Sequence, residues 1–234
     1  MNALLQKMLR KYPDFKLSLS MSGTFLEQAQ QFNPEVLESF KRLVATGRVE
    51  ILSSPYHHSL AFFYSLQEFE TQIELHRQAI RRIFGVETRV LANTELAYND
   101  QLAKWAENHN FSGVLAEGWD PILDWRSPNY VYRPSGTEKI GLLLKNYRLS
   151  DDLAFRFSNR NWNGWPLTAE KFNAWAMDSL QHAPLLNLFM DYETFGEHQW
   201  SETGIFDFFE SFVGCWLNNP DNTFYTVSEA LSAQ

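Results

Sequence analysis

The chain has 234 residues, of which 44% are hydrophobic and 21% charged, a globular composition that excludes wholesale disorder. The formal charge of −8 argues against nucleic acid as a partner, because phosphate binding relies on clustered Lys and Arg. Cys215 is the only cysteine, which excludes an intrachain disulfide. Eight Trp, nine Tyr and 19 Phe exceed the needs of a core and suggest a cleft that stacks on flat apolar faces.

Two features bear on location. Apolar runs such as residues 185–190 are far shorter than the ~20 residues that span a bilayer. Residues 3–10 follow an amphipathic helical pattern and lack the composition of a secretory signal. We therefore expect no membrane association and a cytoplasmic location.

Capping residues and glycines mark the ends of the expected helices. Ser65 and Glu68 match a capping box, and Gly85 stands where a left-handed residue closes the same helix. Asn33 followed by Pro34 is a typical cap and first helical position. The pattern predicts helices over residues 3–10, 22–31, 35–46, 65–84, 99–110, 150–157, 168–181 and 204–216.

Short apolar segments alternate with these helices. They predict strands over residues 15–20, 48–52, 89–93, 113–116, 141–145 and 185–190, with one more extended piece at 224–227 and a long loop over 117–134. The strands are continuously apolar, which is typical of parallel strands covered on both faces. The six strand–helix units suggest a barrel or near-barrel, built as one domain over residues 1–234.

Polar residues cluster directly after several strands, where parallel barrels carry their chemistry. The last predicted strand is followed by three carboxylates and a histidine, namely Asp191, Glu193, Glu197 and His198. A single carboxylate is most often a helix cap or a solvated charge. Several acids at one barrel mouth repel one another unless a positive species or transition state compensates. Paired carboxylates with stacking aromatics are typical of glycoside hydrolysis.

Three segments of the sequence resemble glycoside hydrolase family 57, in its α-amylase-like branch. They match the second, third and fourth sequence regions of that family and read Gly47-Arg48-Val49-Glu50, Asn93-Thr94-Glu95-Leu96 and Met190-Asp191-Tyr192-Glu193-Thr194-Phe195-Gly196-Glu197-His198. The resemblance implies a (β/α)7 barrel and a retaining enzyme that acts on α-glucans such as starch, glycogen and maltooligosaccharides. The third of these segments is highly specific.

The resemblance also implies roles for individual residues. Glu95 matches the family nucleophile and Asp191 its general acid/base. Glu50 and Glu193 match residues that bind sugar hydroxyls, and His58 falls where the family carries a histidine. Further candidates for substrate binding are His198 and two tryptophans in loops, Trp119 and Trp200.

A metal site is an alternative interpretation of His57, His58 and His198 with the nearby acids, because imidazoles and carboxylates ligate zinc or manganese. The sequence lacks the closely spaced His-x-x-x-His or Asp-x-His pairs of such sites. Family 57 enzymes require no metal. We therefore expect neither a metal nor another cofactor.

The family's first region, a His-Gln-Pro motif on the first strand, is absent from this sequence. We therefore expect an incomplete barrel with six of its seven strands, whose exposed edges favour self-association. Two hypotheses follow: an active hydrolase or transglycosylase that forms a covalent glycosyl-enzyme, or an inactive, glucan-binding fragment of such an enzyme. The sequence leaves open whether water or a second sugar is the acceptor.

Overall fold

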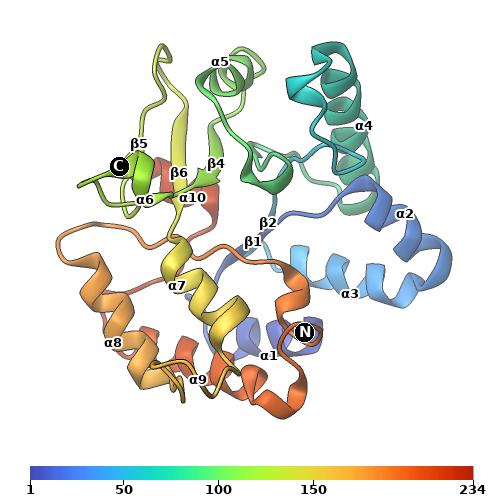
Figure 1. Ribbon diagram of the computed structural model, residues 1–234. Coiled ribbons are helices and arrows are strands. Elements are labelled where there is room, and N and C mark those ends of the chain that lie inside the picture. The colour runs from blue at the N-terminus through green and yellow to red at the C-terminus, as the bar shows by residue number, and fades with distance from the viewer. Residues whose placement is uncertain (234) are drawn as a thin grey trace.

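The computed structural model describes residues 1–233, in which helices alternate with short strands (Figure 1). The first sheet is a parallel pair, β1 (Leu17–Leu19) and β2 (Val49–Ile51). The second sheet has the order β3 (Val90–Leu91), β4 (Gly113–Glu117), β6 (Gly141–Lys145) and β5 (Val131–Tyr132). A parallel bridge between Ser53 and Leu91 links the two sheets. The result is a mixed α/β fold whose strands pair in parallel, except for β5.

The predicted strand over residues 185–190 is wrong for the described chain. These residues are half-buried and are not assigned to a sheet. Asn187 hydrogen-bonds at the end of β6: its Nδ2 donates to the Leu144 carbonyl at 3.1 Å, and its carbonyl accepts from the N–H of Asn146, the residue after β6, at 2.8 Å. Because α7 (Tyr147–Asp151) begins directly after Asn146, β6 offers residues 188–190 no further extended backbone. The other predicted strands are present as β1, β2, β3, β4 and β6.

Three short elements depart from the prediction. The loop predicted over residues 117–134 contains α6 (Asp120–Leu123) and β5, which pairs antiparallel with β6. A two-residue strand is too short to show a period in the sequence. The extended piece predicted at 224–227 runs into a helix, α10 (Val227–Ser232). Thr226 and Glu229 form a capping box there, so a Thr-x-x-Glu signal for this helix was present in the sequence.

The longer helices form close to the predicted ranges. They are α1 (Asn2–Lys11), α2 (Gly23–Phe32), α3 (Pro34–Val44), α4 (Leu66–Phe84), α5 (Asp100–Asn108), α8 (Ala169–Leu180) and α9 (Ile205–Leu217). The Ser65 hydroxyl accepts from the Glu68 N–H at 3.3 Å, as predicted. The Glu68 carboxylate instead accepts from Gln72 Nε2 at 2.8 Å, so half of the predicted capping box is replaced by a contact within α4.

Two of the predicted N-terminal caps are wrong. The Asn33 side chain makes no capping hydrogen bond to α3, a helix that begins with Pro34. The helix predicted from Ser150 starts earlier, as α7, because Asn146 caps it by accepting from the Leu149 N–H at 3.3 Å. A π-helical turn (Asp152–Arg156) continues α7. Ser150 is buried and its hydroxyl accepts from the Phe189 N–H at 3.1 Å, so it ties residues 185–190 to α7.

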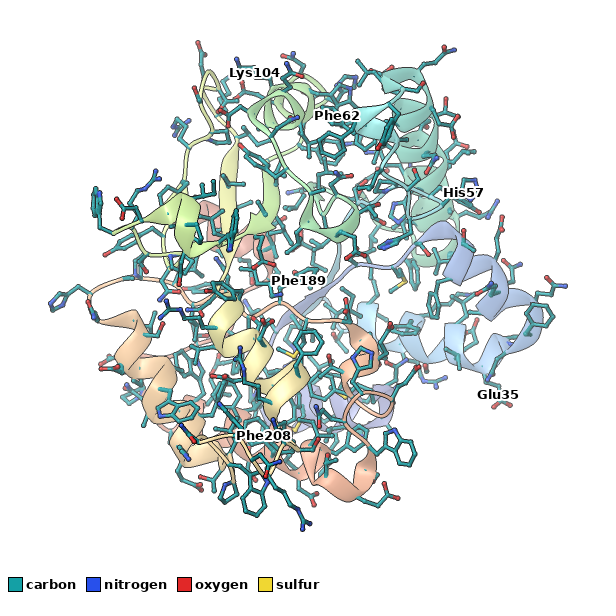
Figure 2. The ribbon with its side chains drawn as sticks, viewed as in Figure 1. Glu35, His57, Phe62, Lys104, Phe189 and Phe208 are labelled. Atoms are coloured by element: carbon teal, nitrogen blue, oxygen red, sulfur yellow. The ribbon has the colours of Figure 1, made fainter. Side chains whose placement is uncertain are left out.

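Apolar side chains hold the helices against the strands. One cluster joins α1, α2 and α3 to β1 and β2, and a second joins α4 and α5 to β4 and β6. A third lies among α7, α8 and α9, around Phe208 in Figure 2. In a fourth cluster, Ala230 of α10 packs with Leu115 and Leu143, and Figure 1 shows α10 beside β4 and β6. Among the described residues, every helix is too short or too polar to cross a membrane.

Candidate active site

Two loops that follow neighbouring strands bring His58 and Glu95 together. His58 lies in the loop after β2, and Glu95 lies in a 3-10 turn (Thr94–Leu96) after β3. The distance between His58 Nε2 and Glu95 Oε1 is 3.0 Å. The side chains are 58% and 76% exposed, so the pair is open to a ligand. An imidazole N–H donated to a carboxylate fixes the orientation of both groups.

The backbone of this pair is strained. His58, Glu95 and Leu96 have φ values of 53°, 57° and 53°, in the left-handed region that side chains disfavour. Such residues cost free energy, are held in place by their surroundings and cluster at functional sites. The turn is held by the buried Leu96 and by Asn93, whose Nδ2 donates to the Ala97 carbonyl at 2.8 Å. Its buried frame therefore presents Glu95 outward.

A buried amide on α4 anchors the loop that carries His58. Gln72 Oε1 accepts from the His57 N–H at 3.2 Å and from the Ser59 hydroxyl at 2.9 Å. These two donors flank His58. Gln72 is 4% exposed, so both hydrogen bonds are shielded from water, and this strengthens their hold on the loop.

Tyr56 fixes the start of the same loop. Its ring packs over Gly23, where an added Cβ would lie 2.2 Å from a ring carbon, so a larger residue would displace the ring. The Tyr56 hydroxyl donates to Glu27 Oε1 at 2.7 Å. Burial and this hydrogen bond raise the pKa of Tyr56 to about 12, which keeps the phenol protonated as a donor. Figure 2 shows the next residue, His57, where α2 and α4 meet.

The loop over residues 191–200 contains both anchoring and exposed side chains. Thr194 and Gln199 are buried, and Gln199 Nε2 donates to the Ala154 carbonyl at 2.9 Å. The Phe195 ring packs edge-on against Phe209 of α9, with 5.3 Å between their centres. The predicted site residues of this loop remain exposed, and they are Asp191, Glu193, His198 and Trp200. The buried side chains of this loop therefore hold it to the helices, while the predicted site residues face solvent.

Tyr192 pins the start of this loop to distant parts of the chain. Its hydroxyl donates to Asn2 Oδ1 on α1, and its ring lies 5.7 Å from that of Phe40 on α3. Burial raises the pKa of the Tyr192 phenol above its ordinary value. Asp191 is therefore preceded by a segment fixed to α7 and followed by a residue fixed to α1 and α3.

The segments that carry Glu95 and Asp191 contribute to one apolar cluster. Leu96, next to Glu95, is buried in the cluster that Phe189, two residues before Asp191, packs against. Figure 2 shows Phe189 near the centre of the molecule. The predicted tryptophans are exposed, Trp119 by 55% at the start of α6 and Trp200 by 66%. His198 lies near Phe155, with 6.4 Å between ring centres and an interplanar angle of 30°.

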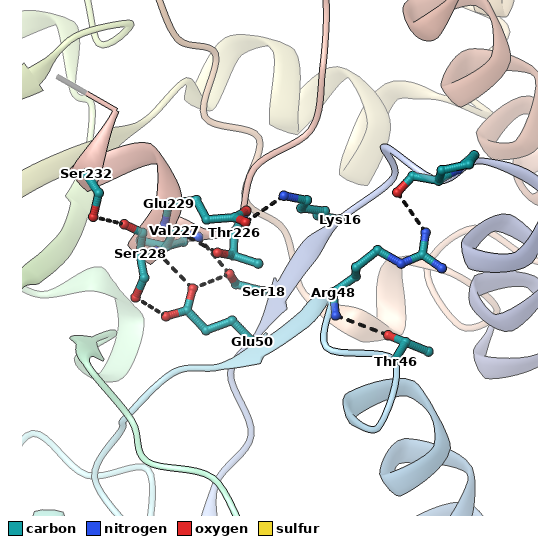
Figure 3. Close-up of polar contacts among 11 residues, drawn as sticks. Lys16, Ser18, Thr46, Arg48, Glu50, Thr226, Val227, Ser228, Glu229 and Ser232 are labelled. Atoms are coloured by element: carbon teal, nitrogen blue, oxygen red, sulfur yellow. Dashed lines mark hydrogen bonds and ion pairs between the residues drawn. The ribbon is translucent and has the colours of Figure 1, made fainter.

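Glu50 stands in a different environment from the other predicted site residues (Figure 3). One carboxylate oxygen accepts from the Ser18 hydroxyl at 2.9 Å and from the Ser228 N–H at 3.0 Å, and the other accepts from the Ser228 hydroxyl. Ser228 lies in the first turn of α10, where free N–H groups and the helix dipole favour an anion. Glu50 therefore joins β2 to β1 and α10.

Two supporting residues were not among the predicted site residues: Gln72, which holds the His58 loop, and Ser228, which contacts Glu50. Gln72 had a detectable signal, because it is a polar residue on the buried stripe of α4 next to Phe69, Ile73 and His76. The Ser228–Glu50 contact joins residues 178 positions apart, which no local pattern reports.

Comparisons with known proteins identify a family that matches the whole chain and relatives that match much of it. The family model described as glycosyl hydrolase family 57 matches residues 1–234. A protein of Methanocaldococcus jannaschii named "Putative alpha-amylase" is 49% identical over 208 residues, covering 88% of this chain and 44% of that protein. An alpha-amylase of Pyrococcus furiosus is 23% identical over 147 residues, covering 63% of this chain and 22% of that protein.

A solved structure shares the fold. The crystal structure of 4-alpha-glucanotransferase from Thermococcus litoralis has a TM-score of 0.76 and 19% sequence identity, covering 99% of this chain and 36% of that chain. At this identity the likeness concerns the fold. The chain spans less than half the length of each of these relatives.

Proposed function

The chain belongs to glycosyl hydrolase family 57, and we propose that it cleaves or transfers the α-glucosidic bonds of starch, glycogen or maltooligosaccharides. The observation that carries this proposal is the open, strained Glu95 held against His58 at the end of β3. A carboxylate in this position is rigid at its backbone and accessible at its reacting oxygens, as a nucleophile must be.

The proposed reaction uses Glu95 and Asp191 in two steps. Glu95 attacks the anomeric carbon of a glucosyl unit while protonated Asp191 gives its proton to the departing glycosidic oxygen, leaving a covalent glycosyl ester on Glu95. Asp191 then takes a proton from water or from a sugar hydroxyl, whose oxygen attacks the same carbon and releases Glu95. Net retention follows from the two inversions.

The geometry required for this reaction is demanding, because retaining enzymes hold the two carboxyl groups about 5 to 5.5 Å apart. Leu96 and Phe189, which share an apolar cluster, support such an approach. We assign His58 the role of orienting Glu95, with Nε2–H donated to Oε1. Glu193, His198, Trp119 and Trp200, all exposed, are assigned to binding of the glucan.

We also infer that β1, β2, β3, β4 and β6 are successive strands of an incomplete (β/α)7 barrel, with residues 185–190 following β6 outside the sheets. The parallel pairings and the Ser53–Leu91 bridge support this arrangement. Within residues 1–233, β1 is paired only with β2 and leaves one strand edge open. An open edge favours self-association, which light scattering of the purified chain tests.

A second candidate function is glucan binding without catalysis. The observation that favours it is that Glu50, which matches a residue that binds sugar hydroxyls, is engaged by Ser18 and Ser228 of its own chain. Both functions predict binding of an α-glucan, and only the first predicts its turnover.

Release of reducing ends from soluble starch and maltoheptaose, measured beside a maltoheptaose binding titration, separates the two functions. We expect turnover that Glu95→Gln and Asp191→Asn abolish. Glu35→Gln is the matched control, because Glu35 is an exposed carboxylate on α3 and lies at the outer edge of the molecule (Figure 2). Binding without turnover would establish the second function and eliminate the first.

A further inference from the structure

A pocket outside the proposed catalytic carboxylates lies between α7 with its π-helical turn, the loop over residues 162–164 and α8. Its volume is about 530 Å³. Tyr147, Arg148, Asp152, Arg156, Trp162 and Trp175 are among its lining residues. Neither the family motifs nor the proposed mechanism uses these side chains.

Two tryptophans form an aromatic corner in this pocket. The rings of Trp162 and Trp175 have centres 5.8 Å apart and planes at 77°. The loop folds back over Trp162 at Gly164, where an added Cβ would lie 2.5 Å from the indole. Lys171 Nζ holds the loop to α8 by donating to the Gly164 carbonyl at 2.7 Å. The corner is therefore preformed.

Charged side chains of both signs also line the pocket. Arg156 Nη1 donates to Asp152 Oδ1 at 2.5 Å, and Arg148 pairs with Asp120. Each guanidinium is thus neutralised by a carboxylate while it keeps further N–H donors. A neutral ligand with many hydroxyl groups suits this wall better than a phosphate, which requires uncompensated positive charge.

The pocket is linked to the two predicted site loops. The π-helical turn carries Asp152 and Arg156 into the pocket and also carries Phe155, which stacks near His198 of the 191–200 loop. On another side, the Tyr147 hydroxyl donates at 3.0 Å to Asp120 Oδ2, next to Trp119. π-Helical turns are rare and are frequent at functional sites.

We propose that this pocket binds a glucose unit of an α-glucan, as a remote subsite beyond Glu95 and Asp191. The apolar face of a pyranose stacks on the Trp162–Trp175 corner, and its hydroxyls meet the donors and acceptors of Arg156 and Asp152. The identity of the ligand rests on the proposed function. The remote subsite retains a long substrate while its other end occupies the carboxylates.

The test is a calorimetric titration of maltoheptaose into the full chain carrying Glu95→Gln, which removes turnover. Trp162→Ala should weaken binding about tenfold, because it removes one wall of the corner. Trp125→Ala is the matched control, since Trp125 is 87% exposed and lies outside the lining of the pocket, and it should leave the affinity unchanged. Inorganic phosphate should neither bind nor compete.

Trp162 also packs against the α8 cluster, so its variant can lose stability. Asn163→Ala provides a second test at an exposed lining residue and should weaken binding about threefold with an unchanged melting temperature. Unchanged affinity in Asn163→Ala together with unchanged affinity in a folded Trp162→Ala would overturn the subsite. Competition by phosphate would also overturn it, in favour of an anion site.

The subsite and the proposed function fail in different ways. If the unmodified chain hydrolyses starch but its maltoheptaose affinity does not change on substitution of Trp162 or Asn163, the subsite proposal alone is refuted. Binding that depends on Trp162 without any turnover removes the catalytic proposal and supports the subsite. Absence of maltoheptaose binding in the Glu95→Gln chain overturns the subsite, while turnover by the unmodified chain still reports on catalysis.

Discussion

Glu50 lies on β2 and Glu95 in the turn after β3, and the two carboxylates have opposite environments. Glu50 accepts hydrogen bonds from Ser18 and Ser228 and joins β1, β2 and α10. Glu95 sits on a left-handed backbone with its side chain 76% exposed, and His58 contacts one of its oxygens. The Glu50 carboxylate is thus bound by side chains and backbone of the same chain, whereas most of the Glu95 side chain is accessible to a ligand.

This difference separates stabilising groups from reactive groups. A carboxylate whose oxygens are engaged by internal donors stabilises the fold, and its loss leaves partly buried donors without partners. An exposed carboxylate on a strained turn contributes little to stability and costs backbone energy, which points to a functional reason for its position. Four predictions test this contrast and the buried residues of α4 near the Glu95 site, from the largest expected effect to the smallest.

The largest effect is expected at Glu95. Glu95→Gln should lower the rate of starch hydrolysis roughly a thousandfold or more, because an amide cannot act as the nucleophile. The melting temperature should remain unchanged, because the side chain is exposed. A reducing-end assay and a thermal melt of the same preparation measure both quantities. A variant that keeps its activity would remove Glu95 from the mechanism.

The next largest effect is expected at His76, which lies on the buried face of α4 with Gln72. The folded protein should lose stability in acid because of this residue. His76 is buried, its Nε2 donates to the Met21 carbonyl at 2.9 Å, and burial lowers its pKa from 6.5 to about 4. Between these pH values the unfolded chain binds a proton that the folded chain does not. The contribution of His76 to the free energy of unfolding should therefore fall by about 3 kcal/mol as the pH drops from 6.5 to 4.

Urea unfolding at a series of pH values measures this dependence. His76→Gln is the control, because the amide can still donate to the Met21 carbonyl and does not titrate. The control should lack the His76 part of the pH dependence. An identical slope in both proteins would assign the acid sensitivity to other groups.

Glu50 should show the reverse of the Glu95 result. Glu50→Ala removes the acceptor of Ser18 and Ser228, and it should lower the free energy of unfolding by about 2 kcal/mol. Hydrogen exchange should become faster in α10. Urea unfolding and amide exchange measure the two effects. If stability were unchanged while maltoheptaose affinity dropped, Glu50 would belong to the glucan site, as its motif implies.

The smallest effect is expected at Gln72. Gln72→Leu removes the acceptor for the His57 N–H and the Ser59 hydroxyl, so the loop that presents His58 should loosen. We expect a loss of about 1 kcal/mol in stability and a severalfold fall in kcat at nearly constant KM. A matched Gln67→Leu change, exposed on the same helix, should alter neither quantity. Equal effects of both variants would exclude a positioning role for Gln72.

Much of the candidate site was predictable because its motifs are contiguous in sequence. The stretch from Asp191 to His198 and the Asn93–Leu96 segment carry chemistry in adjacent residues, and the resemblance assigned them directly. The supports were less accessible. Gln72 could be noticed as a polar residue on an apolar stripe, but its contacts with the His58 loop are tertiary. Trp162 follows the predicted helix over residues 150–157, and no local pattern in the sequence places it in a pocket with Arg156.

The sequence by itself determined the alternation of strands and helices, because capping residues and hydrophobic periods act over a few residues. It therefore predicted β1 to β4 and β6 and the longer helices. Only the tertiary structure decided that residues 185–190 remain outside the sheets and that α10 meets Glu50. These outcomes depend on which backbone groups remain available once distant segments have packed, and such long-range competition leaves no local pattern in the sequence.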